Sequence, residues 1–345
     1  MTFLPVIASA FFPIAFVILL GVLAGRAGIM KPGASVVLSI LVLDFCLPAE
    51  LFDSMATTTL NDLPSWRFFV GIAAGLAGIF LLTLLAALTV FRKKLNEGGL
   101  QALNASFPNI AFIGIPIVLA VVGKSGVVFA VIAIVISSLL LPPVALTLLA
   151  AGSREERGNK GLVLLAHSIW GSLRQSVVWA PILGVAFALT GLHLPAVAQS
   201  SFTLIGEATT GVALFALGLL LSGQKLRLGA AAICNAGMKN IAQPLAMWLI
   251  ALALGMSGEP MRVMILCGAL PTAPMTAMFA IKFKVGTEET DETILLSTVF
   301  SLVTVGVVMP VPEKFVPVMV TVVPPLVTPV CGVNEVMVGA GATNL

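Results

Sequence analysis

Pro108 and Asn109, which interrupt an apolar stretch, are the residue pair in this chain best suited to bind a ligand. Proline removes a backbone donor and clashes with the preceding turn, so it breaks a helix. The half-helix that begins beyond the break points its positive dipole end toward it. The Asn109 amide and the freed backbone N–H groups can then donate to a carboxylate. Asn109 could instead only cap the second half-helix, a role compatible with ligand contact.

A second interruption lies 163 residues further along the chain, at Pro271 and Thr272. The hydroxyl of Thr272 occupies the position of Asn109 and can serve similarly. Two matched, interrupted segments in the two halves of a membrane protein are the best sequence pointer to a transporter's binding site. The expected substrate-binding residues are Asn109, Pro108, Pro271, Thr272, Ile110 and Ala273.

Four further polar residues fall inside apolar stretches. Asp44 and Glu207 are also 163 residues apart, and Lys239 is followed by Gln243 four residues later. A charge near mid-membrane costs about 2.5–3.5 kcal/mol on insertion scales, so it usually faces a cavity or a partner. We expect these four residues to couple transport to a proton or sodium ion, or to balance charge. A structural carboxyl or ion pair is the alternative for each charged residue.

The composition is that of an integral membrane protein, with 59% hydrophobic and 10% charged residues, whereas soluble domains carry about 25% charged residues. Apolar runs of about 20 residues favour helices. The basic residues are too scattered for a nucleic-acid surface. No metalloprotease, P-loop or catalytic-triad pattern occurs. We therefore expect no enzyme activity, cofactor, metal or nucleic-acid partner. Arg174 is expected to contact a lipid headgroup.

The apolar pattern predicts ten membrane-spanning helices. Their ranges are 4–25, 33–56, 66–91, 98–122, 125–150, 167–190, 197–222, 228–255, 259–283 and 289–310. The 163-residue offset also matches pairs of glycines, including Gly21 with Gly184 and Gly28 with Gly191. We interpret this as an internal repeat. The expected organisation is a first five-helix repeat at 1–151, a cytoplasmic linker at 152–166, a second repeat at 167–310 and a Pro/Val-rich tail of unknown role at 311–345.

An odd number of helices in each repeat places the two halves in opposite orientations. The basic residues test this, because Lys and Arg gather on the cytoplasmic side. On one side lie Arg26, Lys31, Arg92, Lys93, Lys94, Arg154, Arg157, Lys160, Lys225, Arg227, Lys282 and Lys284. Only Arg67, Lys124, Arg262 and Lys314 fall on the other. The amino terminus is expected outside the cell, with the linker in the cytoplasm.

These segments resemble the auxin efflux carrier family over about residues 4–309. The resemblance rests on Phe107-Pro108-Asn109 with Gly114-Ile115-Pro116, on Ala213-Leu214-Phe215-Ala216-Leu217-Gly218, on Lys239 with Gln243-Pro244, on Leu270-Pro271-Thr272-Ala273 with Phe279-Ala280, and on Ser297-Thr298 with Ser301 and Thr304. It implies an all-α fold of ten transmembrane helices in two inverted five-helix repeats. The fourth and ninth helices would be broken and cross, as in the related bile acid sodium symporters.

The resemblance also implies a function and a division of labour among the helices. Helices one, two, six and seven would form a scaffold, and the others a moving transport domain. Plant members export indole-3-acetate and form dimers, so a homodimer is expected here; bacterial members are linked to malate and malonate. Asn109 carries over as the contact to the substrate carboxylate. The expected function is secondary transport of a small organic anion across the inner or plasma membrane. A passive channel and a cation/proton antiporter are the alternatives.

Overall fold

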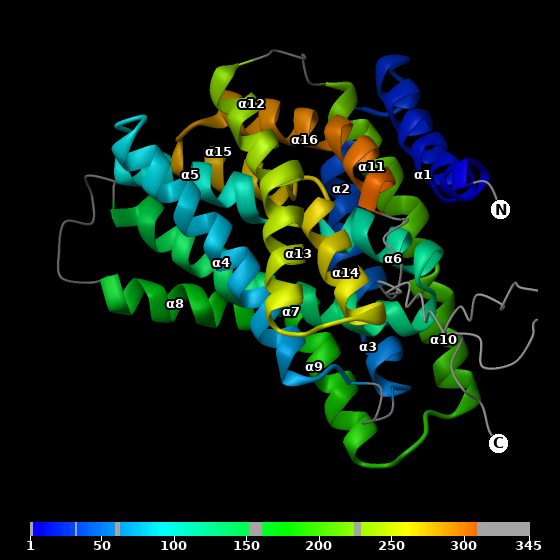
Figure 1. Cartoon of the computed structure of the whole chain (residues 1–345). Coiled ribbons are helices and arrows are strands. Elements are labelled where there is room, and N and C mark those ends of the chain that lie inside the picture. The colour runs from blue at the N-terminus through cyan, green and yellow to red at the C-terminus, as the bar shows by residue number, and fades with distance from the viewer. Residues whose placement is uncertain (1–2, 32, 59–62, 152–160, 224–228, 309–345) are drawn as a thin grey trace, which may run out of the picture.

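The computed structural model of the chain describes residues 3–31, 33–58, 63–151, 161–223 and 229–308, and all elements in these ranges are helical (Figure 1). The first half contains α1 (Phe3–Arg26), α2 (Ala34–Leu41), the π-helical turn η1 (Val42–Cys46), α3 (Leu47–Ala56), α4 (Trp66–Thr89), α5 (Leu95–Ser106), the π-helical turn η3 (Ile110–Gly114), α6 (Ile115–Val121) and α7 (Lys124–Ala151). The second half contains α8 (Gly161–Leu173), α9 (Ser176–Leu189), α10 (Ala196–Gly206), α11 (Ala208–Ser222), α12 (Ala230–Gly237), the π-helical turn η5 (Met238–Ala242), α13 (Gln243–Ala253), α14 (Gly258–Ala269), α15 (Met275–Phe283) and α16 (Thr287–Val308).

Each of the ten predicted segments coincides with one helix or with consecutive helices. Two of the interruptions lie where Pro108 and Pro271 predict them, because α5 ends at Ser106 and α14 ends at Ala269. One boundary differs from the expected linker, since α8 already begins at Gly161. Residues 152–160 of that linker and the tail from 309 onward lie outside the described residues.

Five helical stretches of the described chain are long and apolar enough to cross a membrane. They are Ala34–Ala56, Trp66–Thr89, Lys124–Ala151, Ala196–Ser222 and Thr287–Val308. A sixth would be the pair Leu165–Leu173 and Ser176–Leu189, which is bent by 61° at its break. The all-helical, apolar architecture predicted from the sequence is therefore confirmed. The helices on either side of the breaks at Pro108 and Pro271 are each too short to qualify singly.

Two close helix contacts relate the halves of the chain to each other. α1 packs along α11, and α3 packs along α9 (Figure 1). In the first contact, a Cβ on Gly21 would overlap the carbonyl oxygen of Phe215. In the second, a Cβ on Gly184 would lie 2.7 Å from the carbonyl oxygen of Phe52. Both the glycines and the phenylalanines are 163 residues apart, so the two contacts are reciprocal.

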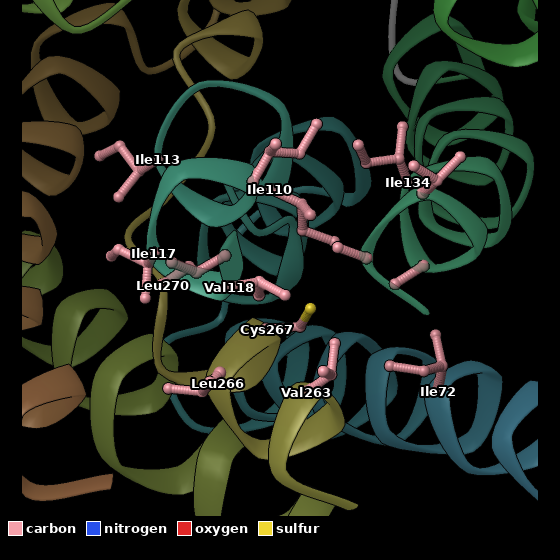
Figure 2. Packing of buried hydrophobic residues seen from close by; sticks show 14 of the residues in the cluster. Ile72, Ile110, Ile113, Ile117, Val118, Ile134, Val263, Leu266, Cys267 and Leu270 are labelled. Atoms are coloured by element: carbon pink, nitrogen blue, oxygen red, sulfur yellow. The ribbon is translucent and has the colours of Figure 1, made fainter. Parts of the chain in front are cut away.

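The buried apolar core surrounds the two interrupted helices. Figure 2 shows Ile110 and Val118, from the segment after the first break, above Val263 and Cys267 of α14. Ile72 of α4 lies on the same side of the cluster as α14. Burial of these side chains fixes the half-helix that follows Asn109 against its neighbours. The core therefore holds the first break in one position.

Replacing Gly21 by alanine should destabilise the protein by about 1–3 kcal/mol, because overpacking forces closely packed backbones apart. The added Cβ would also lie 2.9 Å from the Cα of Gly218. Gly78 is the matched control, since it is inside α4 and a Cβ there meets nothing within 4 Å. Gly78→Ala should leave the melting temperature unchanged or raise it. Thermal unfolding of the purified variants in detergent measures both, and equal melting temperatures would contradict the packing argument.

Candidate functional site

The two breaks meet and bond to each other through their backbones. The Asn109 N–H donates to the carbonyl of Pro271 at 2.9 Å, and the Ala273 N–H donates to the carbonyl of Phe107 at 3.0 Å. Pro108 and Thr272 thereby form an isolated antiparallel bridge. Backbone groups freed by proline are costly in an apolar interior unless they are paired. Each interruption therefore provides hydrogen-bond partners for the other.

Asn109 has the capping role considered for it from the sequence, and its amide nitrogen is left without a partner in the described structure. Its Oδ1 accepts a hydrogen bond from the Phe112 N–H at 3.4 Å, which caps the turn η3. Its side chain is only 4% exposed, and its Nδ2 is buried without a hydrogen-bond partner in the described structure. A buried amide donor left without a partner is unfavourable. Asn109 is thus a cap that keeps one strong donor available.

A cavity of about 330 Å³ lies against the crossing. Of the predicted substrate residues, Pro108, Asn109, Ile110 and Ala273 line it. The rest of the lining comes from α2 and η1, from the residues flanking both breaks, and from α7, α9, α11 and α15. The crossing is thus one wall of a space large enough for a small molecule.

The lining is apolar and carries no charged side chain among the described residues. Besides Asn109, its polar side chains are serines, of which Ser35, Ser39 and Ser138 come from two different helices. Ser138 was identifiable beforehand, because the 163-residue offset pairs it with Ser301. Ser35 and Ser39 gave no comparable signal. A ligand with a hydrogen-bond acceptor at one end and an apolar body would match this lining.

Lys239 of η5 and Gln243 of α13 donate hydrogen bonds to the ends of the two broken helices. Gln243 Nε2 donates to the carbonyl of Ser106 at 2.8 Å, and Lys239 Nζ donates to the carbonyl of Gly268 at 3.0 Å. The last carbonyls of a helix have no partner within that helix. Lys239 and Gln243, both fully buried, supply those partners at the ends of α14 and α5.

Asn240 does the same for Ala269, whose carbonyl accepts from Asn240 Nδ2 at 3.4 Å. Sequence reasoning did not select Asn240. Its position next to Lys239 was the available signal. All three donors therefore stabilise the broken ends of the crossing helices rather than lining the cavity.

Pro271 and Thr272 belong to the crossing but not to the cavity wall. The Thr272 hydroxyl donates to the carbonyl of Asn104 at 2.7 Å, and its N–H donates to Ser297 Oγ at 3.0 Å. Thr272 is fully buried. In this conformation its hydroxyl is committed to the end of α5, so the two symmetry-related positions 109 and 272 have different roles.

Asp44 and Glu207 lie at irregular turns of their helices. Asp44 is in η1, and Glu207 separates α10 from α11. Both side chains are exposed, neither lines the cavity, and neither pairs with Lys239 in the described structure. Arg174, at the bend between α8 and α9, lies 5.2 Å over the ring of Trp170.

An apolar helical bundle whose two broken helices cross beside a cavity defines a class, the membrane transport proteins built on discontinuous helices. The family model for membrane transport proteins matches residues 6–309. The chain belongs to this family, which is that of the auxin efflux carriers, and it is a membrane transporter.

Relatives agree with this membership. The uncharacterized transporter YfdV of Escherichia coli (strain K12) is 31% identical over 296 residues, covering 85% of this chain and 93% of that protein. A putative malonate transporter of Rhizobium meliloti (strain 1021) is 25% identical over 299 residues, covering 85% and 92%. The auxin efflux carrier component 5 of Arabidopsis thaliana is 31% identical over 134 residues, covering 36% and 38%.

Proposed function

We propose that this protein is a secondary active transporter of small organic anions and not an enzyme. The observation that carries the proposal is that Asn109, whose Nδ2 is buried without a hydrogen-bond partner in the described structure, lines the cavity. A carboxylate would complete the hydrogen bonding of this donor, and hydrogen bonds to charged groups are worth about 1.5–3 kcal/mol. Pro108, Ile110 and Ala273 would pack against the ligand, while Pro271 and Thr272 would hold the crossing. Mono- and dicarboxylates such as malonate, malate or auxin-like acids are the candidates, and the apolar lining favours an acid that carries an apolar body.

We also propose that the halves are inverted five-helix repeats, giving ten spans in all. The reciprocal glycine contacts support this, because a two-fold relation between halves exchanges one contact with the other. Backbone geometry adds to it: Gly28 and Gly191, 163 residues apart, both have φ of 70°. Arg92 and Gly255, separated by the same offset, have φ of 49° and 63°. The repeats would occupy 1–151 and 167–310, with the linker between them.

We propose that the cavity opens toward the cytoplasmic side of the membrane. Its exposed lining residues include Val36 at the start of α2 and Ile281 at the end of α15. Arg26 and Lys31 lie just before α2, and Lys282 and Lys284 lie at the end of α15, and the positive-inside rule assigns these basic residues to the cytoplasm. We therefore propose an inward-facing state of a protein in the inner or plasma membrane, with the amino terminus outside.

Alternating access would follow from motion between two groups of helices. The cavity lies between α2, α9 and α11, which belong to the proposed scaffold, and the crossing with α7 and α15, which belong to the proposed transport domain. Sliding one group past the other would close this opening and create one on the opposite side. Asp44, Glu207, Lys239 and Gln243 stay candidates for coupling or charge balance, Arg174 for a lipid contact, and a homodimer for the assembly.

Counterflow in proteoliposomes tests the proposed function. Vesicles loaded with unlabelled malonate or malate should accumulate the labelled acid transiently, and the initial rate should saturate with concentration. A passive channel would give non-saturating flux without counterflow. A cation/proton antiporter would move cations without any organic anion. Either result, across a panel of mono- and dicarboxylates, would overturn the proposal.

A further inference from the structure

A second cavity, of about 110 Å³, lies between α5 and the start of α16, away from the substrate cavity. Its polar lining comes from Lys93, Glu97, Gln101, Asn104, Glu289 and Thr290, with Leu100, Val285 and Gly286 completing the wall. Gln101 and Asn104 are 3% and 1% exposed. Gln101 Oε1 and Asn104 Oδ1 have no hydrogen-bond partner in the described structure. Two residues of this lining therefore each carry a buried acceptor without a donor in the described structure, which is unusual in a protein interior.

The charges around this cavity leave an excess of one negative charge. Lys93 Nζ is 2.7 Å from Glu289 Oε2, so that pair is neutral overall. The other oxygen of Glu289 accepts from Asn235 Nδ2 at 3.3 Å. The carboxylate of Glu97 is then the remaining charged group in the lining. Neutral amide and hydroxyl oxygens with one surplus carboxylate form a weak set of hard oxygen ligands.

We propose that this cavity binds a monovalent alkali cation such as sodium. Gln101 Oε1, Asn104 Oδ1 and Thr290 Oγ1 would provide neutral oxygen ligands, and Glu97 would balance the charge. A calcium ion takes about six to eight oxygen ligands, more than these four side chains supply, and a magnesium ion demands near-ideal octahedral geometry. Water molecules alone are the competing occupant, since they too could donate to the two free amide oxygens.

Asn104 connects this cavity with the crossing. Its Nδ2 donates to Thr290 Oγ1 at 2.9 Å, and its backbone carbonyl accepts from the Thr272 hydroxyl at 2.7 Å. Ala273, which follows Thr272 in the chain, lines the substrate cavity. A cation held by Asn104 would thus bias the segment that forms the substrate site. This coupling role rests on the proposed transport function, whereas cation binding itself does not.

Binding is measured on the purified full chain in detergent, without any substrate. Sodium chloride should raise the melting temperature saturably, by about 2–4 °C at ten times the Kd, relative to choline chloride at equal ionic strength. Gln101→Met, which removes one oxygen at similar volume, should abolish most of this rise. Lys93→Met, which removes a positive charge, should lower the Kd for sodium.

Thr83→Val is the matched control, because Thr83 Oγ1 is also buried without a partner but lies outside the cavity. It should retain the full sodium response. Equal melting temperatures of the original protein in sodium and choline would overturn the inference and leave water as the occupant. An unchanged response in Gln101→Met would overturn it as well. If anion counterflow occurs without a sodium response, only this inference fails; if sodium binds and counterflow is absent, the proposed function fails instead.

Discussion

Asn109→Asp should abolish most carboxylate binding while the protein keeps its fold. The Kd for a carboxylate should rise by about tenfold to a hundredfold. The substitution is nearly isosteric and retains the oxygen that accepts from the Phe112 N–H. It removes the unpartnered Nδ2 donor and places a negative charge beside the ligand. Loss of a hydrogen bond to a charged group alone costs about 1.5–3 kcal/mol, and every 1.4 kcal/mol is tenfold in affinity.

Asn109→Ala separates binding from capping in the same position. It should weaken carboxylate binding to a similar degree, and loss of the cap should also lower stability by about 0.5–2 kcal/mol. Thr272→Val is the control from the second break, because its hydroxyl bonds to the carbonyl of Asn104 and is absent from the cavity wall. It should cost stability and leave the Kd within about twofold. Ligand-dependent shifts in melting temperature and uptake into proteoliposomes measure these effects. An unchanged carboxylate affinity in Asn109→Asp would show that Asn109 does not bind the carboxylate.

The sequence located the breaks correctly because proline acts locally. The loss of an N–H and the clash with the preceding turn depend on no distant partner. Which residues of the two breaks pair with each other was harder to predict from the sequence. The 163-residue offset relates the pair Pro108–Thr272 to the pair Asn109–Pro271, but it does not state which residues of the two breaks face each other. The Thr272 N–H is taken by Ser297 Oγ, a partner 25 residues away, so the hydrogen bonding of the two breaks is not symmetric and could not be derived from the repeat.

The directions of the polar residues inside the spans were also beyond sequence reasoning. Asp44 lies in a π-helical turn, which adds a residue to the turn and rotates every following side chain relative to an α-helical pattern. Its outward exposure therefore does not follow from the apolar periodicity. Lys239 lies in another such turn, and its partner is a backbone carbonyl of a helix distant in sequence. Residue type predicted that these positions matter, whereas contact geometry determines how.

Lys239→Gln should weaken the binding of organic anions and at the same time raise the thermal stability of the empty protein. Lys239 is fully buried, and no carboxylate pairs with it in the described structure. A buried ammonium group without a counter-ion is destabilising, so its removal is favourable. Glutamine can still donate to the carbonyl of Gly268, which now accepts from Lys239 Nζ. Lys239→Met, which cannot donate, leaves that carbonyl unpaired and should be less stable than Lys239→Gln.

The effect on binding should depend on the charge of the ligand. Lys239 bonds to the last turn of α14, whose following break is hydrogen-bonded to Asn109. Opposite charges attract more strongly across a protein interior than across water, so loss of the buried ammonium should weaken the binding of an anion beside Asn109. A dicarboxylate should therefore lose more than a monocarboxylate, since both of its charges interact with the ammonium. Measured Kd values for matched mono- and dicarboxylates, together with melting temperatures, test this. The prediction is that Lys239→Gln raises stability and lowers anion affinity, which is expected only if the buried charge serves the anion. A less stable Lys239→Gln protein with unchanged affinities would show that Lys239 only holds the end of α14.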